Sequence, residues 1–180
     1  MSSILILGGA RSGKSRLAED LVVTTRPVTL IATAEPGDEE MRERILQHQE
    51  ARPPDWSLIE EPIDLIGALG RADPASAVVV DCLTLWVSNL IGEGLGDDEI
   101  EDRALAAAKQ TASRQLATVV VSNEVGSGIV PVNPLARRYR DLLGRVNTIW
   151  ADTVDQVYLT VAGGVVPVQR VRALLEDHDV

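Results

Sequence analysis

The sequence is poor in the residues that build disulfides and metal clusters. It has one cysteine, two histidines and no phenylalanine among its 180 residues. A single cysteine excludes a disulfide framework and a cysteine-based zinc cluster, and it suits a reducing compartment. The two histidines, His48 and His178, stand far apart in the chain, which disfavours a metal site with several histidine ligands.

Positive charge is also scarce. The formal net charge is −10, and only two of the 17 cationic side chains are lysines, Lys14 and Lys109. An acidic chain does not coat nucleic acid or an anionic membrane unless it carries a local basic patch. The apolar run at residues 4–7 is too short for a signal peptide or a membrane span. We therefore expect a cytoplasmic protein with small-molecule substrates and with no nucleic-acid and no membrane partner.

What the sequence does contain is a regular alternation of short apolar runs and longer amphipathic stretches. Expected strands are residues 4–7, 28–32, 78–81, 119–122 and 157–161, because each is apolar throughout and bounded by turn residues. Helical patterns occupy residues 15–24, 38–52, 63–70, 83–91, 97–116 and 135–151. The alternation predicts an α/β fold with a mostly parallel, doubly wound sheet and helices on both faces. The alternative is an α+β fold with antiparallel pairs, which the continuous apolarity of the strands disfavours.

The strongest motif is a phosphate-binding loop (P-loop). It fits G-x-x-x-x-G-K-[ST] and lies between the expected strand 4–7 and the expected helix 15–24. Glycines let backbone N–H groups turn toward phosphate oxygens, and the helix N-terminus adds positive potential. Lys14 reaches the β- and γ-phosphates, and the Ser15 hydroxyl can ligate Mg²⁺. The predicted nucleotide-binding residues of the loop are Gly8, Gly9, Ala10, Arg11, Ser12, Gly13, Lys14 and Ser15.

The length fits one domain built around this loop. A chain of 180 residues can bury a core without disulfides. We expect residues 1–180 to form a single nucleotide-binding domain of the P-loop NTPase type, with residues 171–180 as an extra tail.

A P-loop also needs a carboxylate near Mg²⁺ at the end of a neighbouring strand. Asp81 ends the expected strand 78–81 and is the candidate for this metal site, together with Ser15. The alternative is that Asp81 serves as the N-cap of the expected helix 83–91.

The expected helix 38–52 carries the isolated histidine His48. Met41, Ile45, His48 and Arg52 share one face, whose apolar members turn it inward, and Arg44 lies one turn before the histidine. A neutral imidazole in this place is a competent nucleophile toward phosphorus. From the pattern alone, a helix cap or a satisfied group at the edge of the core is the more ordinary interpretation.

Other polar groups follow the expected strands at the edge where parallel sheets bind ligands. Thr33, Ala34 and Glu35 come after the second strand. Asn123 and Glu124 come after the fourth, where they bind an acceptor or form an ordinary turn. Four arginines on the helix 135–151 either clamp phosphates or form a solvated face; they are Arg137, Arg138, Arg140 and Arg145. The simplest interpretation of Cys82 is a small buried residue beside Asp81.

Several separate stretches together resemble one family. The P-loop is followed in order by Ile-Ala-Thr at 31–33, by a helix with Glu-Met, Arg-Ile and His48, and by Arg-Pro at 52–53 with Trp56. Asp-Cys-Leu-Thr at 81–84, Asn-Glu-Val-Gly-x-Gly-Ile-Val-Pro at 123–131 and Gly-Arg-Val-Asn at 144–147 complete the series. Over about residues 3–168 the chain resembles the bifunctional adenosylcobinamide kinase / adenosylcobinamide-phosphate guanylyltransferase of cobalamin biosynthesis. The histidine helix and the Asn-Glu-Val-Gly loop are more specific than the P-loop.

The resemblance implies two reactions. A nucleoside triphosphate, ATP or GTP, phosphorylates the aminopropanol hydroxyl of adenosylcobinamide, and GTP then guanylylates the product through a GMP–histidine intermediate on His48. The catalytic residues implied are His48 and Lys14, and the cofactor is Mg²⁺. Beyond the P-loop, the nucleotide contacts implied fall on Thr33, Ala34, Glu35, Gln49, Glu50, Ala51, Arg52, Glu60 and Asp81. The resemblance also implies a homo-oligomer, with a trimer as the expected form.

Two other functions are compatible with the motifs. A P-loop kinase with a single activity on a small molecule would transfer the γ-phosphoryl group and form no covalent nucleotide. A nucleotide-binding regulator would bind the triphosphate and transfer nothing.

Overall fold

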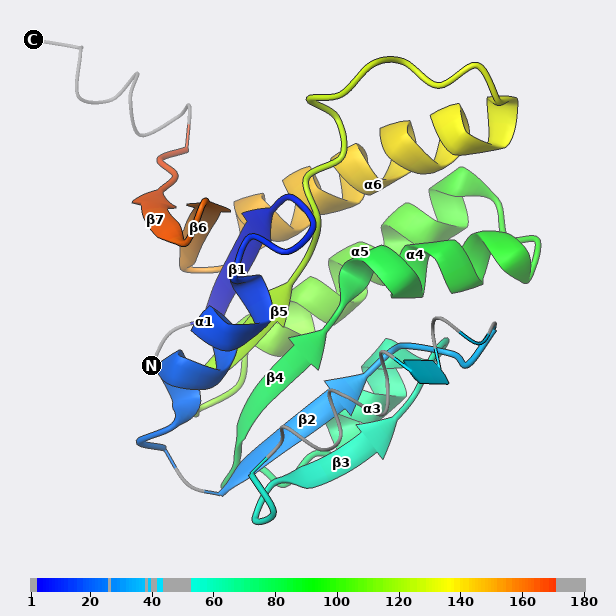
Figure 1. Ribbon diagram of the computed structural model, residues 1–180. Coiled ribbons are helices and arrows are strands. Elements are labelled where there is room, and N and C mark those ends of the chain that lie inside the picture. Colours follow the sequence, from blue (N-terminus) through cyan, green and yellow to red (C-terminus); the bar gives the residue numbers. More distant parts are fainter. Residues whose placement is uncertain (1–2, 26, 38, 40–41, 44–52, 171–180) are drawn as a thin grey trace, which may run out of the picture.

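The computed structural model describes residues 3–25, 27–37, 39, 42–43 and 53–170. A seven-stranded sheet with the strand order β3-β2-β4-β5-β1-β6-β7 runs through the centre of the described part (Figure 1). The strands are β1 (Ser3–Gly8), β2 (Val28–Ala32), β3 (Ser57–Glu60), β4 (Ala77–Asp81), β5 (Thr118–Val121), β6 (Gln156–Val161) and β7 (Gly164–Pro167).

Six of the seven strands are parallel. Each neighbouring pair from β3 across to β6 runs in the same direction, and only β7 pairs antiparallel, with β6. The β6–β7 hairpin turns through Ala162 and Gly163, whose φ angles of 50° and 77° are those of a tight hairpin turn. The prediction of a mostly parallel α/β sheet is confirmed, and the α+β alternative is wrong.

Helices cover both faces of the sheet. The described helices are α1 (Lys14–Val22), α3 (Leu65–Arg71), α4 (Leu83–Gly92), α5 (Asp97–Ala112) and α6 (Pro134–Thr153). On one face, Ala18 and Val22 of α1 pack on the alternate side chains of β1, β4 and β5. On the other face, the apolar sides of α3 to α6 enclose a larger core that includes Trp86 and Trp150. The continuous apolar strands require this three-layer packing, since both of their faces must be covered.

The expected elements match the structure with two omissions. The five expected strands and five of the six expected helices are present, with ends shifted by a few residues. The strands β3 and β7 were not expected; both are four residues long and lie at the two edges of the sheet. The expected helix 38–52 falls almost entirely outside the described residues.

None of the helices in the described part of the chain combines the length and the apolarity that crossing a bilayer would require.

Candidate active site

The P-loop connects the end of β1 to the start of α1. Gly13 precedes α1 with a φ of 97°, in the left-handed region, and no side chain caps the first turn of the helix. The first N–H groups of a helix have no partner within it, so here they remain available to a ligand. Because the helix dipole adds positive potential at the same point, the loop forms an anion site.

Gly8 lets the loop lie close to strand β6. A Cβ atom on Gly8 would lie 2.6 Å from the Thr160 carbonyl oxygen and 2.7 Å from Ser12 Oγ, and it would also collide with Thr160 Oγ1. Ser12 and Thr160 are hydrogen-bonded through their hydroxyls at 2.7 Å. Thr160 Oγ1 also lies 3.2 Å from the Leu7 carbonyl. Only glycine fits at this position, and β6 supports the loop from behind.

Lys14 is almost buried, with 8% of its surface exposed. Its Nζ donates a hydrogen bond of 2.6 Å to the Gly9 carbonyl. Burial lowers the pKa of the Lys14 ammonium, while the nearby Cys82 and Asp81 act in the opposite direction. The Lys14 ammonium is thus held inside the loop, where the oxygens of a bound phosphate would contact it.

Ser15 and Asp81 meet at the other side of the loop. The Ser15 hydroxyl donates to Asp81 Oδ2 at 2.8 Å. Asp81 was expected on a neighbouring strand, but β5 lies between β4 and β1. The contact forms because α1 crosses over β5 and β4, which brings the first turn of the helix to the end of β4. Cys82, and not Asp81, occupies the N-cap position of α4, so the interpretation of Asp81 as a helix cap is wrong.

These two side chains fit a magnesium ion. A hydroxyl and a carboxylate are hard oxygen ligands, and Mg²⁺ is commonly bound by one or two such groups together with substrate phosphates. The Ser15 and Asp81 oxygens lie 2.8 Å apart, and both residues line the pocket beside the P-loop.

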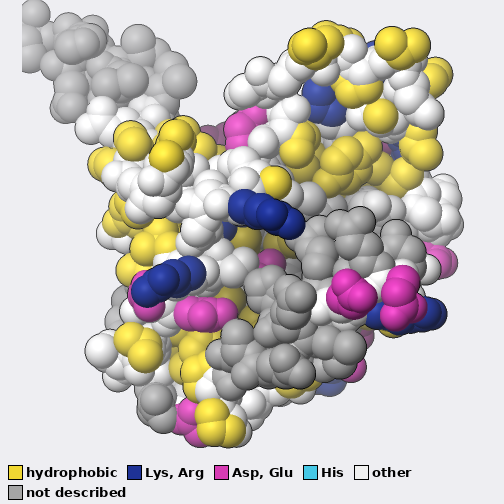
Figure 2. All heavy atoms as spheres, in the orientation of Figure 1, with side chains coloured by type: hydrophobic (Ala, Val, Ile, Leu, Met, Phe, Trp, Pro, Cys, Tyr) yellow, Lys and Arg dark blue, Asp and Glu magenta, His cyan; other side chains and the backbone are white. Residues whose placement is uncertain are grey.

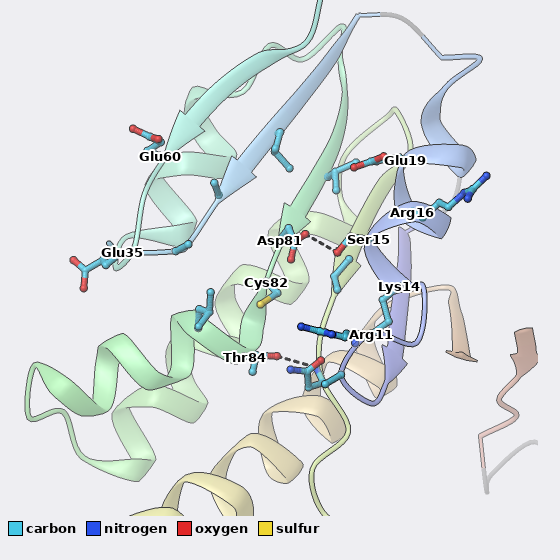
Figure 3. Close-up of a pocket in the computed structure, with 18 of the residues that line it drawn as sticks. Arg11, Lys14, Ser15, Arg16, Glu19, Glu35, Glu60, Asp81, Cys82 and Thr84 are labelled. Carbon is cyan, nitrogen blue, oxygen red and sulfur yellow. Dashed lines mark hydrogen bonds between the residues drawn. The ribbon is translucent and has the colours of Figure 1, made fainter. Parts of the chain in front are cut away.

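A pocket of about 1010 Å³ opens beside the loop. It extends from the P-loop across the carboxyl ends of β5, β4, β2 and β3 (Figure 3). Glu35 and Glu60 stand on the opposite side of the pocket from Lys14. The predicted site residues that line it are Ala10, Arg11, Ser12, Gly13, Lys14, Ser15, Ala34, Glu35, Glu60 and Asp81. The structure therefore brings together residues from four separate stretches of sequence at the ligand edge of the sheet.

Thr33 supports the pocket from within the protein. It is fully buried, and its hydroxyl donates to the Cys82 carbonyl at 2.7 Å and accepts from the Cys82 N–H at 2.8 Å. Asn89 donates from Nδ2 to the Thr33 carbonyl at 2.8 Å and to the Pro62 carbonyl at 3.2 Å. These bonds join the segments after β2, β3 and β4. The nucleotide contact expected at Thr33 stays a prediction, since its hydroxyl already has both partners in the protein.

The two residues after β5 have different roles. Glu124 Oε1 accepts from the N–H groups of Gly126 and Ser127 at 2.6 and 2.9 Å, which is ordinary turn chemistry. Asn123, in contrast, lines the pocket. Its backbone N–H donates to Thr84 Oγ1 at 2.8 Å.

The four arginines of α6 form ion pairs and hydrogen bonds with other groups of the protein. Arg138 and Arg145 form ion pairs with Asp97 of α5, both at 2.7 Å, and Arg145 also pairs with Glu101 at 2.6 Å. Arg137 donates to the carbonyls of Pro131 and Val132, and Arg140 pairs with Asp141. Of the two alternatives for these arginines, the structure favours a surface role, since none of the four lines the pocket.

Cys82 lies at the pocket wall with its thiol in a poorly hydrated place. Burial, reinforced by the charge of Asp81, raises the pKa of the Cys82 thiol to about 12. Because only the thiolate is a good nucleophile, this raised pKa disfavours a nucleophilic role for Cys82.

His48, Gln49, Glu50, Ala51 and Arg52 lie outside the described residues, and so do Arg44 and Met41. Their predicted roles stay predictions.

Some pocket residues were not singled out from the sequence. Trp56, Thr84 and Leu85 line the pocket, together with Arg42, which pairs with Glu39 at 3.2 Å. Trp56 and Thr84 stand inside the stretches that carry the family resemblance, which was the available signal. Leu85 has no such signal, because a leucine in an apolar helix is an ordinary core residue.

Comparison with known proteins gives a consistent result. The chain matches the family described as Cobinamide kinase / cobinamide phosphate guanyltransferase over residues 4–168. It is 42% identical to the bifunctional adenosylcobalamin biosynthesis protein CobP of Pseudomonas aeruginosa, over 92% of this chain and 96% of that protein. The proteins named bifunctional adenosylcobalamin biosynthesis protein CobU from Salmonella typhimurium and Escherichia coli are each 38% identical, over 89% of this chain and 96% of theirs.

Among solved structures, the chain is similar to the KaiC-like protein PH0186 of Pyrococcus horikoshii. The TM-score is 0.53 and the sequence identity is 11%, over 88% of this chain and 70% of that one. At this identity the likeness concerns the fold alone, and it agrees with a P-loop NTPase-type sheet.

Proposed function

Because the chain belongs to the cobinamide kinase / cobinamide phosphate guanyltransferase family, we propose that it is a bifunctional transferase of cobalamin biosynthesis. It phosphorylates adenosylcobinamide with a nucleoside triphosphate. It then transfers GMP from GTP to adenosylcobinamide-phosphate, which gives adenosylcobinamide-GDP and pyrophosphate. The observation that carries this proposal is a family match over residues 4–168 together with a P-loop pocket assembled from the matching stretches.

The geometry around the P-loop supports the kinase step. The acceptor hydroxyl oxygen bonds to the γ-phosphorus, the bond from that phosphorus to the bridging oxygen breaks, and the hydroxyl proton is released. Negative charge spreads over the γ-phosphate oxygens during this transfer. Lys14 leaves its resting bond to the Gly9 carbonyl and, with the N–H groups at the start of α1, stabilises that charge.

Ser15 and Asp81 would hold Mg²⁺ in this proposal. The adjacent hydroxyl and carboxylate oxygens, 2.8 Å apart, support this assignment. The ion when bound neutralises charge on the phosphates.

The far end of the pocket is suited to the nucleoside. Glu35 and Glu60 stand across the pocket from Lys14 (Figure 3). Carboxylates accept hydrogen bonds, and guanine offers N–H donors on its Watson–Crick edge. This arrangement supports GTP as a substrate with its phosphates at the P-loop and its base toward Glu35 and Glu60. ATP is the alternative donor for the kinase step.

For the second step we assign the nucleophile to His48, with Gln49, Glu50, Ala51 and Arg52 beside the nucleotide. A neutral imidazole nitrogen bonds to the α-phosphorus of GTP, and pyrophosphate leaves with the electron pair of the α–β bridge. The support is the family's histidine pattern in the sequence and the family match that covers it. The adduct keeps the N–H of the imidazole, so no proton has to move.

Incubation with GTP labelled at the α-phosphate tests this function against its main alternative. The bifunctional enzyme is expected to take up label that is labile in acid and stable in alkali. A kinase with a single activity transfers only the γ-phosphoryl group and takes up no label, so an unlabelled protein would contradict the guanylyl half of the proposal.

The same experiment extends to the third possibility. A nucleotide-binding regulator forms no product. Addition of adenosylcobinamide to GTP and the protein, followed by chromatography for adenosylcobinamide-GDP, would therefore eliminate this class. Light scattering would determine whether the protein is the homo-oligomer that the family implies.

A further inference from the structure

Arg11 is exceptional among the arginines of the described residues because it has no protein partner. No hydrogen bond or ion pair joins it to another described residue, and it lines the pocket. Every other arginine in the described ranges contacts a carboxylate or a carbonyl of the protein. These are Arg16, Arg42, Arg71, Arg103, Arg114, Arg137, Arg138, Arg140, Arg145 and Arg170.

The backbone at Arg11 has an unfavourable conformation. Its φ angle is 55°, in the left-handed region that glycine adopts without cost. A side chain in this region costs roughly 1–2 kcal/mol. The loop therefore carries a large cationic side chain at a position where its geometry favours glycine, which points to a use for that side chain.

The direction of Arg11 separates it from the donor site. Lys14 stays against the loop, bonded to the Gly9 carbonyl. Arg11 instead extends from the loop toward the wall that carries Cys82 and Thr84 (Figure 3). Thr84 accepts the backbone N–H of Asn123, so Thr84 and Asn123 form one continuous wall beside the P-loop.

The donor triphosphate already has its ligands. The loop N–H groups, the start of α1 and Lys14 surround the phosphates in any P-loop. The guanylyl step brings a second anion, because its acceptor is a phosphate monoester with a charge near −1.5 to −2. A cation between two phosphates reduces the repulsion that opposes their approach. A guanidinium is well suited to this position, since its planar fork binds phosphate through two parallel hydrogen bonds.

We propose that the Arg11 side chain binds the phosphate of the phosphorylated acceptor during guanylyl transfer, against the wall formed by Thr84 and Asn123. This inference rests on the proposed function. With Arg11 holding two of its oxygens, a third oxygen of the acceptor phosphate bonds to the α-phosphorus of the GMP adduct. The P–N bond breaks, and its electron pair returns to the imidazole nitrogen, which regenerates neutral histidine.

Comparison of the two half-reactions in Arg11→Gln tests the proposal. Formation of labelled protein from α-labelled GTP needs no acceptor, so its rate is expected to fall much less than the transfer step does. Transfer to adenosylcobinamide-phosphate is expected to show a KM raised roughly 10- to 100-fold, as for the loss of a charged hydrogen bond. Arg11→Lys keeps the charge but loses the fork, so it should recover part of the affinity.

Arg103→Gln is the matched control. It removes one positive charge from α5, where Arg103 pairs with Glu99 at 2.8 Å, and both half-reactions should be unchanged. Circular dichroism would show whether each variant is folded. If Arg11→Gln does not fold, Arg11→Lys carries the test, with a smaller rise in KM and normal labelling.

The outcomes separate this inference from the function on which it rests. If labelling and transfer fall together, Arg11 serves the nucleotide and the inference is wrong. It is equally wrong if the acceptor KM does not change in the folded variant. A wild-type protein that takes up no label contradicts the guanylyl function itself, and the inference fails with it.

Discussion

Lys14 shows at the scale of one residue how the site is prepared for phosphate. Only 8% of the Lys14 surface is exposed. Within the described residues its ammonium makes one hydrogen bond, to the Gly9 carbonyl. Burial of a charge with few partners is unfavourable, and this lowers the pKa of Lys14. A bound triphosphate would provide the missing partners, so the unfavourable burial becomes binding energy when the ligand arrives.

Replacement of Lys14 by alanine is therefore expected to weaken both activities. Loss of a cation aimed at developing charge typically lowers kcat by about 10² to 10³. Initial rates of phosphorylation and of guanylyl transfer would measure the effect. The control is Lys109→Ala, which replaces the other lysine of the chain, on α5. Unchanged rates in Lys14→Ala would contradict the assignment of the P-loop.

His48 should divide the two activities. We expect His48→Ala to take up no label from α-labelled GTP and yet to keep kinase activity, because γ-phosphoryl transfer does not use the imidazole. His178→Ala, which changes the other histidine of the chain, is the matched control and should label normally. If a folded His48→Ala lost both activities, the histidine would have a positioning role instead.

The sequence predicts residues whose chemistry is local, and it misses those whose role depends on the fold. Lys14 and Ser15 follow from the P-loop pattern, and Asp81 follows from its place at a strand end. Their meeting is confirmed by the bond between Ser15 and Asp81 at 2.8 Å. The direction of Arg11 and the bonds from the Thr33 hydroxyl to Cys82 depend on the backbone path and on residues far away in the chain. No local pattern records them.

At the scale of elements, the buried strands were predictable and the edge strands were not. The central strands β1, β4 and β5 are covered on both faces and read as unbroken apolar runs. In β3 and β7 nearly every residue is exposed, so their sequences carry little of the apolar signal. Edge strands owe their conformation to the neighbour that pairs with them, which a sequence pattern does not contain.

The helices α5 and α6 are joined by a network of charges centred on Asp97. Arg138 and Arg145 both bond to its carboxylate and lower the pKa of Asp97, with the Arg138 hydrogen bond as the main cause. Shared charges lose less side-chain entropy than separate pairs, so the network should exceed an isolated surface pair, which is worth about 0–1 kcal/mol.

Asp97→Asn is expected to lower the free energy of unfolding by about 1 kcal/mol and to leave both activities unchanged. Urea unfolding of Asp97→Asn, Arg138→Gln and the double variant would give the coupling energy, with Asp98→Asn, the next residue of α5, as the control. If Arg138→Gln instead reduced activity without affecting stability, the alternative of a phosphate clamp on α6 would be supported.

For the molecule as a whole, an acidic chain must hold two anionic substrates. Its net charge is −10. Figure 2 shows that, on the face it displays, Lys and Arg side chains stand in small separate groups and not as one basic surface. Positive potential is therefore produced locally. The start of α1 and Lys14 provide it for the triphosphate, and Arg11 provides it for the acceptor phosphate. Such a site attracts a small anion locally.

A second feature of the whole molecule is a set of hydrogen bonds between the first residue of β1 and the residue just before β6. Asp155 accepts from the Ser3 N–H at 2.8 Å and from the Ser3 hydroxyl at 2.9 Å. In return, the Asp155 N–H donates to Ser3 Oγ at 3.0 Å. These bonds lower the pKa of Asp155 from its ordinary value of 3.8, with the backbone N–H of Ser3 as the main cause. They position the strand that leads into the P-loop beside the strand that supports it from behind.

Asp155→Asn should therefore destabilise the protein in a pH-dependent manner. A carboxylate whose pKa is lowered by folding contributes stability that is fully present above its unfolded pKa and is lost as the pH falls through the folded value. Since Asp155 is mostly exposed, we expect a loss of about 1 kcal/mol or less at pH 7, which corresponds to about 2–4 °C in Tm at most. Thermal unfolding of the wild type and of Asp155→Asn between pH 7 and pH 3 should show the two curves converging below the ordinary pKa of 3.8. The control is Asp152→Asn, which changes an exposed carboxylate on α6. A difference in Tm that does not change with pH would show that Asp155 acts through its shape and neutral hydrogen bonds, and not through its charge.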